Sequence, residues 1–238
     1  MTGRREILPD PEALAERLAD FVVESVGESQ RLRGTASLVL AGGGTPRVAY
    51  ELLARAPRRN AIDWTRVTIL FGDERCVAPT DADSNYRMAR EALLAHVPLR
   101  ASSILRMRGE ADPAIAAAEY AAMIRERFGA SPRFDLVLLG MGPDGHTASL
   151  FPGSDPFADD EALVRSVYSE SKRQWRLTLT PSAINGAYAV AVALAGSEKA
   201  PTYAAIARGD GDPVRYPIEA IAPRDGQLIW FVERSVLG

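Results

Sequence analysis

Residues 36–46 read ASLVLAGGGTP, a short apolar run followed by three consecutive glycines, a threonine and a proline. The run 36–41 predicts a short buried strand, and residues 47–56 return to a helical pattern. Further short apolar runs occupy residues 67–71, 134–139, 177–180, 188–194 and 228–232. These runs are apolar on both faces and helical segments separate them, which indicates a mostly parallel sheet covered by helices on both sides.

The first helix is expected to begin at Asp10 and Pro11, where a capping side chain precedes a proline at the first helical position. Further helices are predicted from residue 83 to about residue 97, over residues 113–128 and over residues 198–208. A long loop rich in glycine and proline runs from residue 140 to about residue 156. No repeat, low-complexity tract or linker interrupts the chain, so we expect a single α/β domain over residues 1–238.

The composition excludes several classes of protein. The chain has 238 residues, a net charge of −3, 47% hydrophobic residues and a single cysteine, Cys76. No apolar run reaches the roughly 20 residues that a membrane span needs, and the first ten residues lack a signal-peptide core. The slightly acidic balance argues against a nucleic-acid partner. We therefore expect a soluble cytoplasmic protein, a monomer or small homo-oligomer, with no nucleic-acid or membrane partner.

Four predicted strands end in unusual loops, at residues 42–46, 72–75, 140–146 and 196–199. In open α/β sheets, ligands bind beyond the carboxyl ends of the strands. If the sheet is parallel, all four loops lie along the same edge. The sequence therefore predicts a binding site at that edge.

The loop 42–46 indicates phosphate binding. Its glycines allow backbone N–H groups to point at an anion, and the start of the following helix adds partial positive charge. Thr45 adds a possible hydroxyl donor. The alternative is a tight turn in which Thr45 only caps the helix. The loop is not a P-loop, because no Gly-Lys-Ser/Thr follows.

Residues 140–145 read GMGPDG and match the G-x-G-x-x-G pattern of dinucleotide-binding proteins. We discount this match, because Pro143 removes a backbone donor, and Pro152, Gly153 and Pro156 prevent a long helix after it. His146 follows Asp144 in the same loop, the position expected for a catalytic base. The alternative is an ordinary surface histidine. The other histidine, His96, lies near a helix end before Pro98, where its charge is favourable.

Two other loops carry charged groups suited to an anionic ligand. Arg75, in the stretch Asp73-Glu74-Arg75, either binds a phosphate or carboxylate or braces the loop through salt bridges, and the sequence leaves both open. Lys199 is one of only two lysines and lies at a helix start. Cys76 is interpreted as a small buried residue. Metal-ligand spacing such as H-E-x-x-H and the hydrolase pattern G-x-S-x-G are both absent.

Together these stretches resemble the family that unites glucosamine-6-phosphate isomerases with 6-phosphogluconolactonases. The matching stretches are residues 41–46 (AGGGTP), 71–77 (FGDERCV), 83–86 (DSNY), 140–152 (GMGPDGHTASLFP), 176–180 (RLTLT) and 196–200 (GSEKA). The resemblance implies a three-layer α/β sandwich with a mostly parallel central sheet, like that of glucosamine-6-phosphate deaminase. It also implies hydrolysis of a phosphorylated sugar lactone, without a metal or organic cofactor.

The resemblance assigns roles to individual residues. His146 would activate a water molecule, with Asp144 orienting it. The phosphate would be held by Gly43, Gly44, Thr45, Arg75 and Lys199, assisted by Arg176 and Lys172. Asp73 and Asn85 would contact sugar hydroxyls or fix the loops.

Two rival functions remain open at this point. One is a sugar-phosphate isomerase or deaminase, but in that sister family a glutamate stands five residues after the histidine, where this chain has Phe151 after Leu150. Neither side chain can transfer a proton. The other is a non-catalytic sugar-phosphate sensor in a transcription regulator. The single helix before Ala36 leaves no room for a helix-turn-helix module with its linker.

Overall fold

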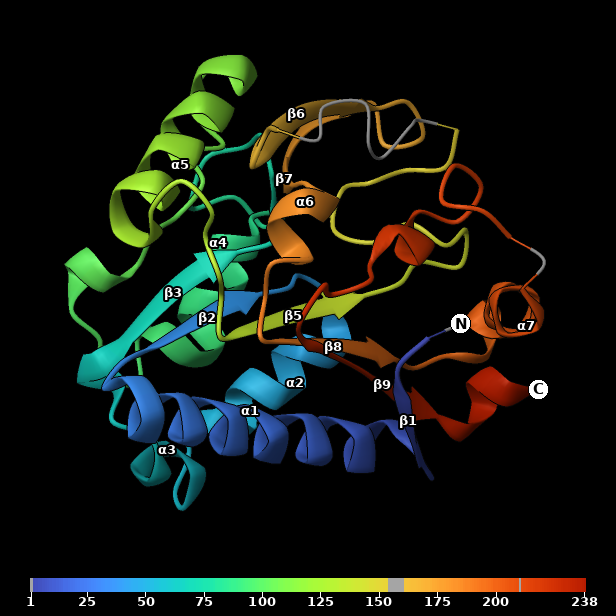
Figure 1. Ribbon diagram of the computed structural model, residues 1–238, viewed down its shortest axis with the longest axis horizontal. Coiled ribbons are helices and arrows are strands. Elements are labelled where there is room, and N and C mark those ends of the chain that lie inside the picture. Colours follow the sequence, from blue (N-terminus) through green and yellow to red (C-terminus); the bar gives the residue numbers. More distant parts are fainter. Residues whose placement is uncertain (1, 154–160, 210) are drawn as a thin grey trace.

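The computed structural model describes residues 2–153, 161–209 and 211–238 and is built around a six-stranded sheet (Figure 1). The strands lie in the order β1 (Arg4–Leu8), β9 (Gln227–Glu233), β8 (Ala189–Leu194), β5 (Leu136–Gly140), β2 (Ala36–Leu40) and β3 (Val67–Phe71). Every neighbouring pair is parallel. All residues of β2 and β3 are buried, because both faces of the sheet are covered. The predicted parallel sheet is confirmed.

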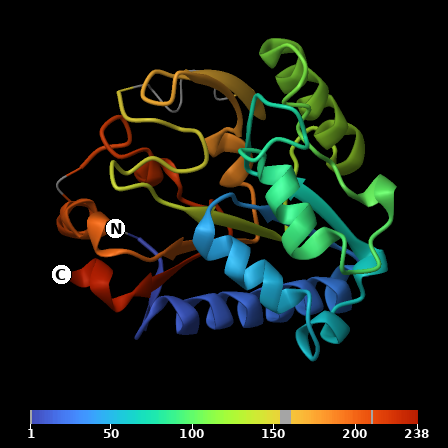
Figure 2. The same ribbon diagram turned by 180° about the vertical axis from the view of Figure 1, so that it is seen from behind.

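One face of the sheet is covered by α1 (Pro11–Arg33), α2 (Gly44–Leu53), α3 (Arg58–Ala61) and α4 (Asn85–Ala89). Leu38 and Ile69 project to this face and pack in one core cluster with Leu18 of α1 and Tyr50 of α2. The start of α1 is as predicted, since Asp10 accepts a hydrogen bond from the Ala13 N–H at 2.8 Å. Figure 2 shows α1 running along the bottom of the sheet.

The opposite face carries α5 (Pro113–Phe128), α6 (Pro181–Ile184), α7 (Ala200–Arg208) and a second, smaller sheet. That sheet has the order β4 (Asp73–Arg75), β7 (Gln174–Leu179) and β6 (Val164–Ser169), with both pairs antiparallel. Val39 and Val137 of the main sheet pack on this side in a second core cluster with Tyr120 of α5 and Leu177 of β7. The result is three layers, as the resemblance implies.

Several predicted boundaries were wrong. The run 177–180 belongs to β7 in the small antiparallel sheet, because its partners are β4 and β6. The helix expected over 83–97 is α-helical only to Ala89 and continues as a π-helical turn, Arg90–Leu94. The helix expected over 47–56 begins earlier, at Gly44, and ends at Leu53. The last part of the predicted loop 140–156, from residue 154, lies outside the described residues.

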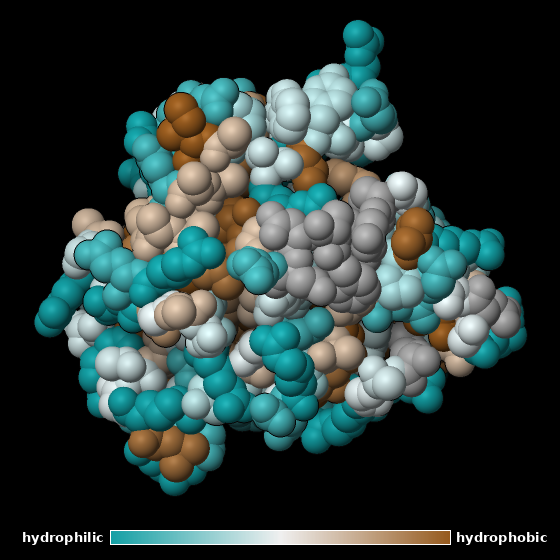
Figure 3. All heavy atoms as spheres, turned by 45° about the horizontal axis from the view of Figure 1, so that its top comes forward, coloured by the Kyte–Doolittle hydropathy of each residue, from teal (hydrophilic) through white to brown (hydrophobic). Residues whose placement is uncertain are grey.

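The surface seen in Figure 3 is mostly hydrophilic, and its hydrophobic side chains form small separate spots. This distribution agrees with a core that lies between the three layers. Among the described residues, no helix has both the length and the hydrophobicity required to cross a membrane.

Candidate active site

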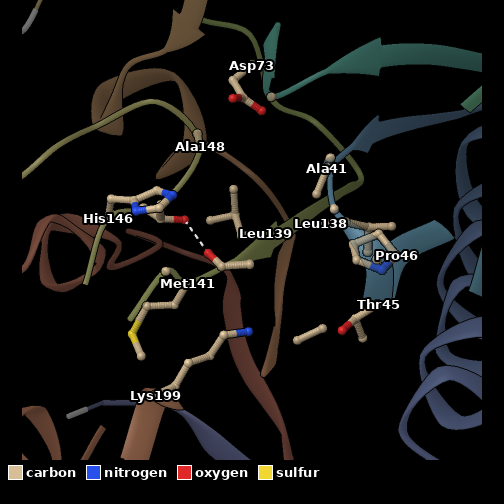
Figure 4. A pocket seen from close by; sticks show the side chains of 18 of the residues that line it. Ala41, Thr45, Pro46, Asp73, Leu138, Leu139, Met141, His146, Ala148 and Lys199 are labelled. Atoms are coloured by element: carbon tan, nitrogen blue, oxygen red, sulfur yellow. Dashed lines mark hydrogen bonds between the residues drawn. The ribbon is translucent and has the colours of Figure 1, made fainter. Parts of the chain in front are cut away.

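A cavity of about 270 Å³ opens at the carboxyl edge of the main sheet (Figure 4). All four predicted loops contribute to its wall. The lining includes Gly42, Gly43, Gly44, Thr45 and Pro46 after β2, Gly72, Asp73 and Arg75 after β3, Gly140, Met141, Gly142, His146, Thr147 and Ala148 after β5, and Lys199 after β8. The expectation that these loops meet at one edge is therefore confirmed.

The loop after β2 leads directly into α2. Gly43 has φ +105° and ψ 171°, a conformation that is essentially restricted to glycine, and it is the residue that precedes the helix. No side chain caps this helix end, so the alternative in which Thr45 caps it is wrong. The Tyr50 hydroxyl donates to the Ala41 carbonyl at 3.0 Å and accepts from the Ala41 N–H at 2.9 Å, which fixes the start of the loop. The uncapped helix start is suited to an anion.

Lys199 faces this helix start across the cavity. Figure 4 shows the Lys199 ammonium and the Thr45 hydroxyl pointing toward one another. Burial lowers the pKa of Lys199, and the neighbouring Glu198 charge opposes this shift only in part. Within the described part of the chain, the ammonium donates no hydrogen bond. Lys199 and the start of α2 thus form a positive end of the cavity with unused donors.

Arg75 and Arg176 lie directly opposite each other on β4 and β7. Arg75 lines the cavity and donates from Nη1 to the Asp83 carbonyl, whereas Arg176 is 8% exposed and lies outside the lining. Among the described residues, the Nε atom of each arginine is buried without a hydrogen-bond partner. Burial, followed by repulsion from Arg75, lowers the pKa of Arg176. Within the described residues, Arg75 forms no salt bridge with Asp73 or Glu74. This disfavours the alternative in which Arg75 braces the loop through salt bridges.

Asp73 and Glu74 lie side by side in β4 but have different surroundings. The carboxylate of Asp73 lines the cavity and accepts hydrogen bonds from Asn85 Nδ2 at 3.1 Å and Ser149 Oγ at 2.7 Å. Glu74 instead accepts from the backbone N–H groups of Asn85 and Tyr86 at the start of α4, at 2.7 and 2.8 Å. Burial raises the pKa of Glu74, and these hydrogen bonds only partly offset that effect. Asp73 therefore lines the cavity, and Glu74 anchors the loop.

Asn85 is buried and does not line the cavity. It donates to the Asp73 carbonyl at 2.9 Å as well as to the carboxylate. Its amide also packs against Gly42, where an added Cβ would lie 2.2 Å from Asn85 Oδ1. Of the two roles considered for Asn85, this geometry favours fixing the loops.

The loop after β5 turns back on itself instead of starting a helix. Gly145 N–H donates to the Gly142 carbonyl at 3.0 Å, and Gly142 N–H donates to the His146 carbonyl at 2.9 Å. The turn places Asp144 Oδ1 2.6 Å from His146 Nδ1. Burial raises the pKa of Asp144, but the charge and hydrogen bonds of His146 outweigh this and the net shift is downward. The chain thus forms a carboxylate–imidazole pair where the G-x-G-x-x-G match would have placed a helix start.

The His146 ring is held from two sides. An added Cβ on Gly142 would lie 2.2 Å from two atoms of the ring, and the Phe151 ring centroid lies 5.3 Å from the His146 centroid. The side chain of His146 remains 31% exposed. Its position is therefore restricted while it stays accessible to a ligand.

The remaining predicted residues lie away from the cavity. Lys172 is exposed in the turn between β6 and β7, outside the lining. His96 lies near a helix end, as predicted, where its Nε2 is 2.8 Å from the Glu91 carbonyl, and it does not line the cavity. Burial raises the pKa of Cys76 to about 11, which makes it a poor nucleophile. Pro156 falls outside the described residues.

Two features of the site were not predicted from the sequence. Ser149 was quoted only as part of the stretch 140–152, and its contact with Asp73 joins loops that are 76 residues apart. The pairing of Arg75 with Arg176 depends on a sheet that was not expected. Across the residues that the structure describes, no group of three or more His, Cys, Asp or Glu side chains is arranged to hold a metal ion.

The chain is similar to known proteins over nearly its whole length. Residues 9–230 match the family of glucosamine-6-phosphate isomerases and 6-phosphogluconolactonases. A 6-phosphogluconolactonase of Nostoc sp. is 34% identical over 97% of this chain and 95% of its own length. Among solved structures, the 6-phosphogluconolactonase of Thermotoga maritima is 27% identical, with a TM-score of 0.85 over 98% of this chain and 100% of the other. A monomeric glucosamine-6-phosphate deaminase, 19% identical over 99% and 100% of the two chains, has a TM-score of 0.85 and shares the fold alone.

Proposed function

The chain belongs to the family of glucosamine-6-phosphate isomerases and 6-phosphogluconolactonases. We propose that it hydrolyses a phosphorylated sugar lactone by general-base activation of water. It is a lactone hydrolase that converts 6-phospho-D-glucono-1,5-lactone to 6-phospho-D-gluconate in the oxidative pentose phosphate pathway. The observation that carries the mechanism is that His146, which is paired with Asp144 just outside the lining, shares one cavity with Lys199.

His146 is the proposed base. Because the Asp144 carboxylate can only accept, the short contact places the imidazole proton on Nδ1 and leaves the lone pair on Nε2. Nε2 takes a proton from water as the water oxygen bonds to the lactone carbonyl carbon. Asp144 keeps the ring in this tautomer and stabilises the imidazolium that forms. General-base assistance of this kind typically contributes about 10²–10⁴-fold.

The collapse of the tetrahedral intermediate uses the same histidine. The bond between the carbonyl carbon and the ring oxygen breaks, and the imidazolium returns its proton to that oxygen, which becomes the 5-hydroxyl group. The new carboxylic acid then loses its own proton to water. A cation or a backbone N–H at the cavity wall stabilises the oxyanion before collapse.

The positive end of the cavity is proposed to hold the phosphate. Gly44, Thr45 and Lys199 line the same cavity, and the backbone N–H groups of Gly44 and Thr45 have no partner within α2, which Gly43 precedes. Arg75 lines the same cavity, and Arg176, which lies opposite Arg75 in the small sheet, adds positive charge. Asp73 is proposed to accept from a sugar hydroxyl. Lys172 assists only if the β6–β7 turn approaches the bound substrate.

The wider assignments rest on composition and on the chemistry of the substrate. A δ-lactone is already a reactive ester, so we propose hydrolysis without a metal or organic cofactor. We also propose a single catalytic domain over residues 1–238 that acts in the cytoplasm as a monomer or small homo-oligomer. Neither nucleic acid nor a membrane is a proposed partner.

The decisive experiment is an assay with freshly generated 6-phosphogluconolactone beside glucosamine 6-phosphate, with spontaneous lactone hydrolysis subtracted. We expect turnover of 6-phosphogluconolactone and no turnover of glucosamine 6-phosphate. Release of ammonia from glucosamine 6-phosphate would favour the deaminase, although Leu150 and Phe151 offer no group for proton transfer. Binding of sugar phosphates without any turnover would identify a sensor.

A further inference from the structure

We propose that Ser149 is a positioning residue that fixes His146 relative to the substrate-binding carboxylate of Asp73, an inference that rests on the proposed function. Ser149 lies three residues after the base and is 1% exposed. It therefore does not touch the substrate and acts only through its partners.

Ser149 binds both members of one cross-strand pair. Its hydroxyl donates to Asp73 Oδ2 at 2.7 Å, and its backbone N–H donates to Thr178 Oγ1 at 3.2 Å. Asp73 of β4 and Thr178 of β7 lie opposite each other in the small sheet. Ser149 thus attaches the loop that carries the base to the sheet that carries the substrate-binding carboxylate.

The segment between His146 and Ser149 is short and constrained, so the position of one depends on the other. Thr147 Oγ1 donates to the Gly140 carbonyl at 2.7 Å, a contact drawn as a dashed line in Figure 4. Ala148 has φ +48°, a left-handed conformation that costs energy for a residue other than glycine. Such a conformation persists only when contacts on both sides hold it, and Thr147 and Ser149 supply these contacts.

Asn85 provides an internal comparison, because it holds the other oxygen of the same carboxylate. It comes from α4 and packs against Gly42 in the loop assigned to phosphate binding. Loss of Asn85 therefore loosens Asp73 and the loop 42–46. The attachment of the loop that carries His146 stays intact. Loss of Ser149 loosens the base loop and leaves Asp73 with both Asn85 bonds.

Substitutions of Ser149 and Asn85 should change different kinetic parameters. We expect Ser149→Ala to lower kcat about 10- to 100-fold, the range for a hydrogen bond to a charged group, with KM within about twofold of the wild type. We expect Asn85→Ala chiefly to raise KM. The affinity for 6-phosphogluconate, measured by calorimetry, should stay within about twofold in Ser149→Ala and fall in Asn85→Ala.

Two variants separate positioning from a general loss of structure. Ser29→Ala removes another buried serine hydroxyl, one that bonds the Ser25 carbonyl within α1 and lies outside the cavity. It should leave kcat unchanged. Thr178→Val removes the acceptor for the Ser149 N–H while keeping the side-chain shape, and should lower kcat less than Ser149→Ala without raising KM. This second variant also tests the inference if Ser149→Ala fails to fold.

A double-mutant cycle tests whether Ser149 acts through Asp73. In an Asp73→Ala background, Ser149→Ala should reduce kcat by less than about threefold, because its acceptor is already gone. A kcat of Ser149→Ala equal to that of Ser29→Ala, or an undiminished loss in the Asp73→Ala background, would overturn the inference. Absence of lactone turnover in the wild-type protein would instead refute the proposed function, so the two failures are distinguishable.

Discussion

Two glycine-rich loops follow the neighbouring strands β2 and β5, and they produce opposite kinds of chemistry. After β2, Gly43 directs the chain straight into α2, and the loop presents backbone N–H groups. After β5, the turn between Gly142 and Gly145 bends the chain back, and the loop presents the side chains of Asp144 and His146. Similar composition at equivalent places thus gives the proposed anion-binding end in one case and the proposed base in the other.

Proline explains part of the difference. Pro46 is the third residue of α2, where a backbone N–H would have no partner within the helix, so it is compatible with the helix. Pro143 lies inside the turn of the other loop, where it removes a donor that a dinucleotide phosphate would need. The position of proline relative to the glycines therefore distinguishes the two loops. Substitutions in the β5 loop should change kcat, and those in the β2 loop should change KM.

The largest effect is expected from His146→Ala. Removal of the base should lower kcat by about 10²–10⁴-fold while the affinity for 6-phosphogluconate falls far less. Initial rates corrected for spontaneous hydrolysis give kcat, and calorimetry gives the affinity. A variant with near-normal turnover would show that His146 is not the base.

Gly142→Ala should cause the second-largest loss of kcat. The new Cβ would lie 2.2 Å from the His146 ring, so the imidazole must move by about 1 Å or more. Displacement on that scale can reduce a rate by about 10²-fold. We expect the loss in kcat, with KM little changed. A change confined to KM would contradict the division between the two loops.

Gly43→Ala is the matched change in the other loop. A non-glycine residue at φ +105° costs roughly 1–3 kcal/mol, so the start of α2 should shift and bind the phosphate less well. We expect KM to rise about tenfold with kcat within about twofold. Steady-state kinetics on the two alanine variants, run side by side, measure this contrast. Equal losses of kcat in Gly43→Ala and Gly142→Ala would contradict the division between the two loops.

The smallest effect concerns pH. Since burial lowers the pKa of Lys199, the ammonium loses its proton at a lower pH than the ordinary value of 10.5. KM should therefore begin to rise before that pH as the phosphate loses a positive partner. The same shift means that buried charge on Lys199 costs folding stability below its pKa and that this cost disappears as pH rises through it. In Lys199→Arg, which stays charged, the alkaline rise in KM should vanish; if it persists, another group causes it.

The sequence was most informative where the signal is local. The apolar runs of β2, β3, β5, β8 and β9 predict strands without knowledge of their partners, because burial on both faces requires apolar residues at every position. Glycines that end a strand also mark a loop locally. Because parallel strands share one direction, these two signals were enough to predict that the four loops meet at one edge.

The small sheet was not predicted, because its strands depend on distant partners. β4 is only the three residues Asp73–Arg75, and β6, which reads VRSVYS, has no clean alternation of polar and apolar residues. Both exist through pairing with β7. Arg176 was assigned to the substrate by resemblance, but its place opposite Arg75 follows from this pairing alone.

The sequence by itself determined the chemical groups of the site: the proposed base His146, its partner Asp144, the glycine loop after β2, and Lys199. It also determined the parallel sheet that collects them, because hydrophobic burial is encoded residue by residue. The tertiary structure alone decided how these groups are held. The bonds from Ser149 and Asn85 to Asp73 span 76 and 12 residues, and no local pattern encodes contacts that form only when β4, β7 and the loops have already folded together.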